Sequence, residues 1–410
     1  MRVLVLSSVY PTPTIPTRGV FVHERARHLA GACQVEVVAP VSWFPLNRLV
    51  RGRDRALVPP VETRDGLTVF HPRFFSVPRF GKSLDALFYF AAALPFLARL
   101  RRRFAFDLID AHFAYPDGLA GLLVGRVLGV PVTVTLRGTE SRLARSRLHR
   151  PQIARVLRQA ERVIAVSQSL ADLASTLGAP PERLRVIPNG VDVERFQRGP
   201  RADARRRLGL PLDAPLIVSV GGLTERKGHH RVLAALAHIL PKHPEVLFAA
   251  VGGPSVEGDT GPLLRRMVAE LGLGERVRLP GAVRHDEIAA WLQAADLFCL
   301  STRNEGRPNA VLEALACGLP VVTTAVGGNL ELVQSGRDGF VVPFGDEGAL
   351  VDAVLTALSK EWNHDAISAR ARSRTWEHAA AQVLAELEAV VSERRPAPGP
   401  ELPDPARRSP

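Results

Sequence analysis

The stretch from Glu305 to Thr324, EGRPNAVLEALACGLPVVTT, decides the fold, because it joins two apolar runs through a loop and a helix. The run LFCLST, which ends at Thr302, and the run PVVTT, which starts at Pro320, are typical of buried strands. Pro308 suits the first turn of a helix, where its missing N–H is tolerated. We therefore expect a strand, a loop, a helix and a strand in succession, which is the repeating unit of a parallel sheet.

The same alternation of apolar runs and helical periods fills the rest of the chain, in two blocks. Continuous Val, Ile and Leu runs joined by helices indicate parallel sheets covered on both faces. We therefore predict an α/β protein with two doubly wound, Rossmann-like domains. The predicted strands are RVLVLSS, QVEVVAP, LTVFHP, FDLIDAHF, VPVTVTLRG and RVIAVS in the first block, and PLIVSVGG, VLFAAVGG, RVRLPG, LFCLST, PVVTTA and GFVVPF in the second. The first block also has helical segments at 21–30, 84–102, 119–128 and 152–161.

Length and composition further narrow the class of protein. The 410 residues exceed what one hydrophobic core usually organises, and the hydrophobic share of 46% is that of a globular protein. No run reaches the ~20 apolar residues of a membrane span. Cys33, Cys299 and Cys317 show no paired spacing, so we expect neither a disulfide frame nor a thiolate metal site, in keeping with a reducing cytoplasm. The net charge of +12 raises the alternative of a nucleic-acid-binding protein.

Glu305 and Glu313, which are separated by seven residues, are the most informative candidates for binding a substrate. Glu313 lies among apolar residues of the predicted helix, so its carboxylate needs partners, and the hydroxyl groups of a ribose or a hexose would supply them. The loop before that helix, from Gly306 through Arg307 and Pro308 to Asn309, leaves free N–H groups that can hold a diphosphate.

In these residues the chain resembles the retaining nucleotide-sugar glycosyltransferases of family 4. Its opening stretch, SSVYPTP…TRGVFVHERARHLA, resembles in particular those of bacterial cell-surface polysaccharide assembly. That family has the same glutamate pair, followed by a Cys-Gly-x-Pro-Val-Val segment as at 317–322 here. The resemblance implies that Glu313 binds the nucleotide ribose and that Glu305 lies against the transferred sugar. It also implies the GT-B architecture, in which two Rossmann-like domains face each other across a cleft.

The resemblance covers almost the whole chain and sets its domain limits. The turn in LRVIPNGVD marks the passage between domains, so the first, acceptor-side domain spans 1–190 and the nucleotide-sugar domain spans 191–375. The polar stretch 194–207 separates this turn from the next strand. A last helix at 376–393 is expected to cross back to the first domain. The Pro-rich end, 394–410, is predicted to be disordered.

Further candidate site residues follow predicted strands. Arg226 and Lys227 come before a helix start, where they could hold a phosphate. Many relatives have an arginine where this chain has Gly222, so Arg226 could replace part of that charge. Gly19 lies in the segment 10–24, YPTPTIPTRGVFVHE, just before the first helix, and it either approaches a ligand closely or serves a turn. The resemblance implies that this loop approaches the donor phosphate and the acceptor.

The ends of two other first-block strands also carry polar groups. Relatives have a histidine near the transferred sugar at the position of His112, which is otherwise a structural strand-end residue. Arg137, Gly138 and Glu140 stand where relatives show a Gly-Ser/Thr-Asp pattern, and Glu140 departs from it. In the second block Gly328 matches the family's donor loop, and Glu331 follows it.

The expected reaction is transfer from a nucleotide-diphosphate sugar to a glycan or lipid-linked acceptor with retention, without a metal or a cofactor. Cations and helix N-termini would stabilise the leaving diphosphate. Two alternatives remain at this point: a two-Rossmann nucleotide-sugar epimerase or related phosphorylase, and the basic nucleic-acid-binding protein.

The segment from 84 to 103, LDALFYFAAALPFLARLRRR, is relevant to where in the cell the protein acts. It could dock an otherwise cytoplasmic protein on an anionic membrane surface through Arg101, Arg102 and Arg103, or it could be a core-packing helix with a solvated basic end.

Overall fold

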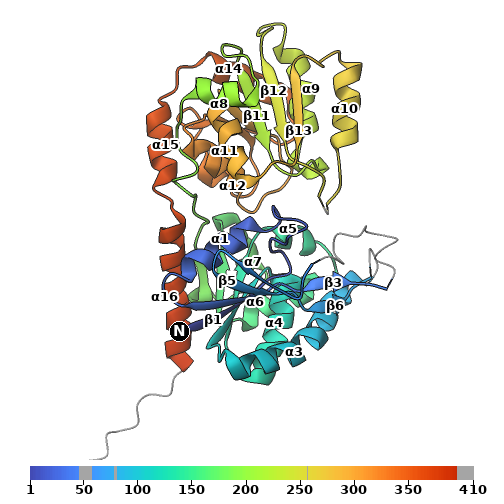
Figure 1. The fold of residues 1–410 in the computed structure, drawn as a ribbon, viewed down its shortest axis with the longest axis vertical. Coiled ribbons are helices and arrows are strands. Elements are labelled where there is room, and N and C mark those ends of the chain that lie inside the picture. Colours follow the sequence, from blue (N-terminus) through green and yellow to red (C-terminus); the bar gives the residue numbers. More distant parts are fainter. Residues whose placement is uncertain (46–57, 78–80, 256, 395–410) are drawn as a thin grey trace, which may run out of the picture.

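The computed structural model describes residues 1–45, 58–77, 81–255 and 257–394, and in it the chain forms two α/β domains that face each other (Figure 1). The first domain holds an eight-stranded sheet in the order β10-β9-β8-β7-β1-β2-β5-β4. All its neighbouring strands run parallel except β4 and β5, which are antiparallel. The strands are β1 (Arg2–Leu6), β2 (Gln34–Val38), β4 (Val61–Arg64), β5 (Leu67–Phe70), β7 (Leu108–His112), β8 (Val132–Leu136), β9 (Arg162–Ala165) and β10 (Leu184–Val186).

The second domain is built on a six-stranded, fully parallel sheet in the order β13-β12-β11-β14-β15-β16. Its strands are β11 (Leu216–Val220), β12 (Leu247–Val251), β13 (Val277–Gly281), β14 (Leu297–Leu300), β15 (Val321–Thr324) and β16 (Gly339–Val342). The chain leaves β11 toward β12 on one side and later returns to β14 on the other. The crevice of this sheet therefore opens between the ends of β11 and β14, where open α/β sheets bind ligands.

Helices cover both sheets, as buried parallel strands require. The first domain carries α1 (Val20–Leu29), α3 (Asp85–Arg103), α4 (Leu119–Leu128), α5 (Thr139–Leu143), α6 (Arg150–Gln159) and α7 (Gln168–Thr176). The second carries α8 (Arg201–Leu208), α9 (His229–Ile239), α10 (Gly261–Glu270), α11 (His285–Ala294), α12 (Asn309–Ala316), α13 (Asn329–Leu332), α14 (Glu347–Ser359) and α15 (His364–Arg372). These elements confirm the predicted fold class and every strand predicted in both blocks.

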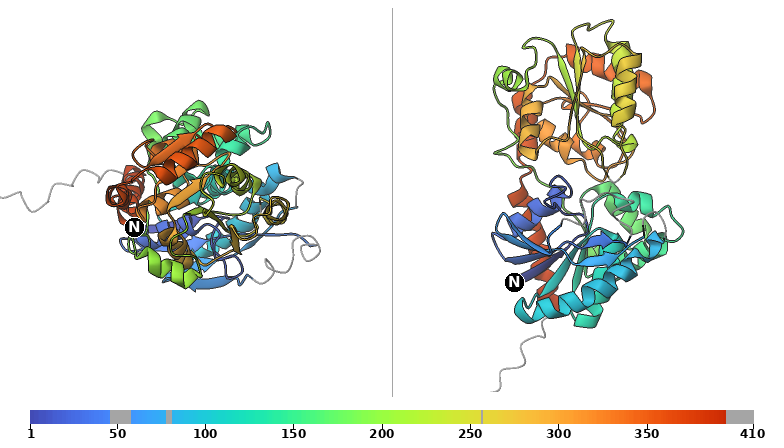
Figure 2. Two further views of the ribbon diagram at one scale, coloured as in Figure 1. Left: turned by 90° about the horizontal axis from the view of Figure 1, so that it is seen from above. Right: turned by 45° about the vertical axis from the view of Figure 1, so that its right-hand side comes forward.

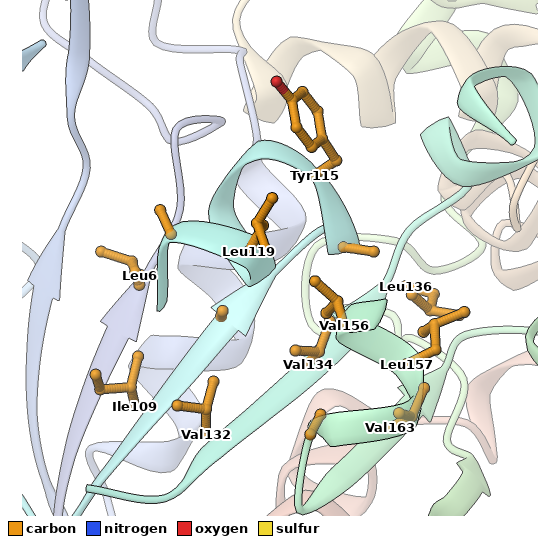
Figure 3. Packing of buried hydrophobic residues seen from close by; sticks show 14 of the residues in the cluster. Leu6, Ile109, Tyr115, Leu119, Val132, Val134, Leu136, Val156, Leu157 and Val163 are labelled. Carbon is orange, nitrogen blue, oxygen red and sulfur yellow. The ribbon is translucent and has the colours of Figure 1, made fainter. Parts of the chain in front are cut away.

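The core of the first domain lies between the middle of its sheet and α3, α4 and α6. Every residue of β7 and β8 is buried, because helices lie on both faces of these strands. Figure 3 shows Ile109, Val132 and Val134 of the sheet beside Leu119 and Val156 of the helices. This packing fixes the carboxyl end of β7, where His112 lies.

The last helix, α16 (Trp376–Arg394), returns to the first domain and runs along its side (Figures 1 and 2). Its Ala380, Val383 and Leu387 pack into the core around β1 and α1. Arg162 of β9 reaches Glu386 at 2.8 Å. The chain thus crosses between the domains at two places.

The two crossings lie side by side. Val191 N donates to the Arg374 carbonyl at 2.9 Å, and Val191 forms an isolated parallel bridge with Thr375. A Cβ on Gly190 would lie 2.2 Å from the Trp376 nitrogen, so only glycine fits between them. Both connections therefore form one hinge.

The structure corrects four smaller expectations. The stretch 194–207 is no mere spacer, since it contains most of α8, in which Arg205 is fully buried and donates to Asp296 at 2.7 Å. The three-residue strands β3 (Val41–Trp43) and β6 (Arg73–Phe75) pair with each other outside the main sheet and were not predicted, and neither were β4 and β10 of the main sheet. The last helix ends at Arg394, one residue later than predicted. The predicted disordered end, from 395 to 410, lies outside the described residues. The stretch Lys82–Arg103 is, by length and composition alone, long and apolar enough to cross a membrane, contrary to the expectation from its sequence.

Candidate active site

A cavity of about 1120 Å³ lies between the two domains. The first domain contributes the loop 14–18 and the start of α1, and the second contributes the carboxyl ends of β11, β12 and β13 together with α12. Three of the predicted donor-site residues line it: Gly222, Asn309 and Glu313. The cavity thus occupies the place where strand ends gather in a doubly wound sheet.

Lys227, Arg226 and Glu305 form one cluster over the crevice between β11 and β14. Lys227 Nζ lies 2.7 Å from Glu305 Oε1, and Arg226 Nη1 lies 3.2 Å from the same oxygen. The Thr302 hydroxyl donates to it at 3.0 Å. Burial alone raises the pKa of Glu305, but the two cations outweigh burial, and the net shift of its pKa is downward. Glu305 is therefore ionised and holds the Lys227 ammonium in place.

The loop after Glu305 touches the first domain. A Cβ on Gly306 would lie 2.3 Å from the Arg137 carbonyl oxygen, and one on Gly138 would lie 2.7 Å from the Gly306 nitrogen. The two glycines allow backbone to meet backbone here, as a side chain on either would not. Helix α12 begins directly afterwards, so its N-terminal N–H groups lie near this contact.

Glu313 points from α12 toward the cavity and is only 9% exposed. Its Oε1 lies 3.3 Å from His285 Nε2, and Arg195 Nη1 lies 2.6 Å from His285 Nδ1. Because a guanidinium can only donate, His285 Nδ1 accepts from Arg195, and Nε2–H donates a hydrogen bond to the Glu313 carboxylate. The imidazole thus leaves the remaining carboxylate oxygen of Glu313 for a ligand.

His112 is buried and is not among the residues that line the cavity. Its Nδ1 accepts from Arg137 Nη2 at 2.8 Å, and its Nε2 lies 3.3 Å from Asp110 Oδ2. Burial lowers the pKa of His112 to about 4, with the Asp110 carboxylate opposing that shift. The ring is therefore neutral at pH 7, and both its nitrogens have protein partners.

A chain of hydrogen bonds continues from His112 to the second domain. Arg137 Nη1 donates to Asn189 Oδ1 at 2.5 Å, and Asn189 Nδ2 donates to Asn309 Oδ1 at 3.0 Å. Asn309 is the first residue of α12. The end of β7 is thus connected through the hinge region to the start of the helix that carries Glu313.

Comparison with known proteins agrees with this geometry. Residues 200–374 match the family described as "Glycosyl transferases group 1", and residues 19–195 match "Glycosyltransferase Family 4". The chain is 31% identical over 400 residues to D-inositol 3-phosphate glycosyltransferase 1 of Catenulispora acidiphila, covering 90% of this chain and 93% of that protein. The chain belongs to glycosyltransferase family 4.

Two further matches support the membership. The putative teichuronic acid biosynthesis glycosyltransferase TuaC of Bacillus subtilis is 32% identical over 337 residues, which are 80% of this chain and 82% of that protein. The sucrose-phosphate synthase of Thermosynechococcus elongatus superposes with a TM-score of 0.77 at 21% identity, over 96% of this chain and 99% of that one. This glycosyltransferase therefore has the predicted GT-B fold, and these matches give no support to the epimerase or nucleic-acid alternatives.

Several predicted site residues of the glycosyltransferase lie away from the cavity wall. Pro308 is the N-cap of α12 and not part of its first turn, because its ψ of 113° is extended. The Arg307 guanidinium turns from the cleft toward Glu331 at 3.7 Å. Gly19, with a φ of 70°, serves the turn, since a Cβ there would lie 2.3 Å from the Val9 carbonyl oxygen. Gly328 approaches the backbone of Arg307, where a Cβ would lie 3.1 Å from its Cα.

Glu140 and Glu331 have structural partners. The Glu140 carboxylate accepts from the backbone nitrogens of Ala114 and Gly138, both at 2.9 Å, and so shapes the ends of β7 and β8. Glu331 of the second domain accepts from Gln168 N at 2.8 Å, at the start of α7 in the first domain. The free N–H groups of that helix end thereby gain a partner from the opposite domain.

Sequence reasoning missed two segments of the cavity wall, 252–255 after β12 and 282–285 after β13. Both follow strands that it had predicted, so the rule that ligands gather at strand ends could have found them. The first-domain residues Phe21 and Glu24 also line the cavity, and they belong to the segment 10–24, whose loop the resemblance had placed near the donor and the acceptor. Among the described residues, no three His, Cys, Asp or Glu side chains gather as a metal site would need.

Proposed function

We propose that this glycosyltransferase moves a hexosyl group from a nucleotide-diphosphate sugar, with retention and without a divalent metal, to a glycan or lipid-linked acceptor at the cytoplasmic side of the membrane. The observation that carries the proposal is the cluster of Lys227 and Arg226 on Glu305 at the crevice between β11 and β14. When the bond from the anomeric carbon to the diphosphate breaks, negative charge grows on the leaving oxygen. Fixed cations and the N-terminal N–H groups of α12 stabilise that charge.

The carboxylates of the cavity wall favour displacement on one face of the sugar. Glu24, Asp192 and Glu313 each have a cationic or hydrogen-bonding partner: Arg27 at 2.8 Å, Arg195 at 3.4 Å and His285 at 3.3 Å. Glu313 is already assigned to the nucleotide ribose, and Glu24 and Asp192 form ion pairs with Arg27 and Arg195, so we assign no carboxylate of this wall to attack on the anomeric carbon. The leaving phosphate would then accept the proton of the acceptor hydroxyl, and the configuration at the anomeric carbon would be retained.

A smaller pocket of about 200 Å³ in the first domain supports a polyhydroxylated acceptor. It shares Thr14, Ile15 and Arg18 with the large cavity, so an acceptor there would lie next to the donor. The hydroxyl groups of Ser8, Thr12, Thr14, Ser42 and Ser76 line it together with Lys82 and Asp85. The names of the relatives refer to two hydroxyl-rich compounds, an inositol phosphate and teichuronic acid.

The test uses the purified chain and a panel of nucleotide sugars. The donor is the compound that raises the melting temperature most, because a ligand that binds only the folded state stabilises it. NMR of the first sugar released by slow donor hydrolysis is expected to show the anomeric configuration of the donor, with or without EDTA. An inverted anomer would contradict retention, and loss of turnover in EDTA that Mg²⁺ restores would contradict metal independence.

A further inference from the structure

The outer side of α3 is an apolar stripe without a partner among the described residues. The opposite side, with Ala86, Tyr89, Ala93, Leu97 and Leu100, packs into the core. On the solvent side Leu84 is 47% exposed and Leu87 is 51% exposed, and the stripe continues at helical spacing through Ala91 and Pro95. Figures 1 and 2 show α3 on the outside of the first domain, away from the second domain.

Aromatic residues from β3 and β6 extend this stripe. Phe75 lies with its ring centroid 5.2 Å from that of Phe88, and Trp43 is 43% exposed. Phe74, the neighbour of Phe75 in β6, and Ser76, which directly follows the strand, are buried and line the small polar pocket. The pleat of β6 thus separates a hydroxyl-lined pocket from an apolar outer surface.

A basic segment borders the beginning of the stripe. Gln152 Nε2 donates to the carbonyl oxygens of Ser83 and Leu148, at 3.1 and 2.8 Å, which fixes the segment before α6 beside the start of α3. Leu148 is 65% exposed and adds to the apolar surface. Around it Arg142, Arg145, Arg147 and Arg150 are exposed and form no ion pair with a described residue.

The arginines at the other end of α3 contribute less than the sequence predicted. Arg101 donates to the Leu128 carbonyl, and Arg103 lies 3.3 Å from Glu36 and over the Phe70 ring. Two of these three cations are therefore held by the protein. Arg99 and Arg102 remain exposed at that end without an ion pair to a described residue, but the four exposed arginines of the 142–150 segment give the N-terminal end of α3, near the polar pocket, the larger free positive charge.

We propose that the α3 surface, formed by Trp43, Phe75, Leu84, Leu87, Phe88 and Leu148, docks on an anionic lipid bilayer. Apolar and aromatic side chains bordered by arginines match the acyl boundary and the headgroups of such a membrane. A second copy of this chain fits less well, because a twofold interface would bring two arginine segments together. Docking would place the polar pocket at the membrane, where the headgroup of a lipid-linked acceptor is presented. Only this last step rests on the proposed function.

The test is sedimentation with vesicles of phosphatidylcholine and phosphatidylglycerol, measured in low and high salt. The double variant Leu87→Glu with Phe88→Glu is expected to lose at least ~10-fold in vesicle partitioning. Arg145→Gln with Arg147→Gln is expected to lose ~25-fold, because each cation near an anionic surface contributes a factor of about five. Matched controls in the second domain are Leu271→Glu, whose leucine is 45% exposed, and Arg265→Gln with Arg266→Gln.

Donor hydrolysis without vesicles checks that every variant remains an intact transferase. Partitioning that falls for both α3-surface variants and not for the controls supports docking. If the glutamate variant does not fold, the arginine variant decides. Docking is overturned if the wild type does not sediment in low salt, if both variants sediment like the wild type, or if the glutamate change dissolves a dimer seen in analytical ultracentrifugation.

Discussion

The ion pair between Lys227 and Glu305 allows the sharpest test of the site. The 2.7 Å between Nζ and Oε1 corresponds to about 6 kcal/mol of Coulomb attraction at an effective dielectric constant of 20. Desolvation of both groups offsets most of it, and a charge-assisted hydrogen bond retains about 1.5 to 3 kcal/mol. We therefore expect a coupling free energy of about 2 kcal/mol between Lys227→Met and Glu305→Gln in a double-mutant cycle.

Urea unfolding at pH 7, followed by tryptophan fluorescence, measures this coupling, since Trp291 and Trp362 lie in the same domain as the pair. The exposed pair of Arg276 and Glu245, at 3.2 Å, is the control and is expected to couple by at most about 1 kcal/mol. A coupling at Lys227 and Glu305 no larger than that of the control would refute the assignment of Glu305 as the group that holds Lys227.

Three further outcomes are expected. Glu313→Ala weakens binding of the donor by about 1 to 3 kcal/mol in calorimetric titration, because a ribose hydroxyl loses its acceptor, and an unchanged Kd would exclude that contact. Gly190→Ala is expected to lower the melting temperature, because the new Cβ would lie 2.2 Å from the Trp376 nitrogen. A melting temperature equal to that of wild type would show that the two crossings separate easily. Because the buried His112 stays neutral while the unfolded chain takes up the proton, the free energy of unfolding is expected to fall by about 3 kcal/mol as pH drops from 6.5 to the folded pKa of about 4. The stability difference between wild type and His112→Gln should therefore shrink over that range in urea titrations, and a constant difference would show that His112 is not held neutral.

The sequence predicted the sheet of each domain well, because continuous apolar runs such as that of β11 have few alternatives to a buried strand. It did not predict β3 or β6, since three residues carry too little periodicity and their pairing depends on distant segments. It placed Arg205 in a spacer because a buried guanidinium is recognisable only by its partner Asp296, which is far along the chain.

Only part of the candidate site was predictable, since His112, Arg307 and Pro308 lie away from the cavity wall although the sequence placed them in the site. Strand ends and the glutamate spacing brought Lys227, Glu305 and Glu313 into one region, as the structure has them. Glu305 pairs with Lys227, and His112 contacts Arg137. Both contacts depend on the directions of side chains that lie far apart in the sequence. Such contacts leave no periodic trace in a sequence.

The hinge has a consequence for protein engineering. Because both crossings meet at Val191 and Thr375, the whole second domain is a single uninterrupted segment inserted between β10 and α16. One exchange of residues 192–374 would therefore replace every second-domain residue of the donor cavity and leave the α3 surface and the small polar pocket untouched. Chimeras cut at these two positions could pair the acceptor preference of this chain with the donor preference of a relative, without a new join inside either sheet.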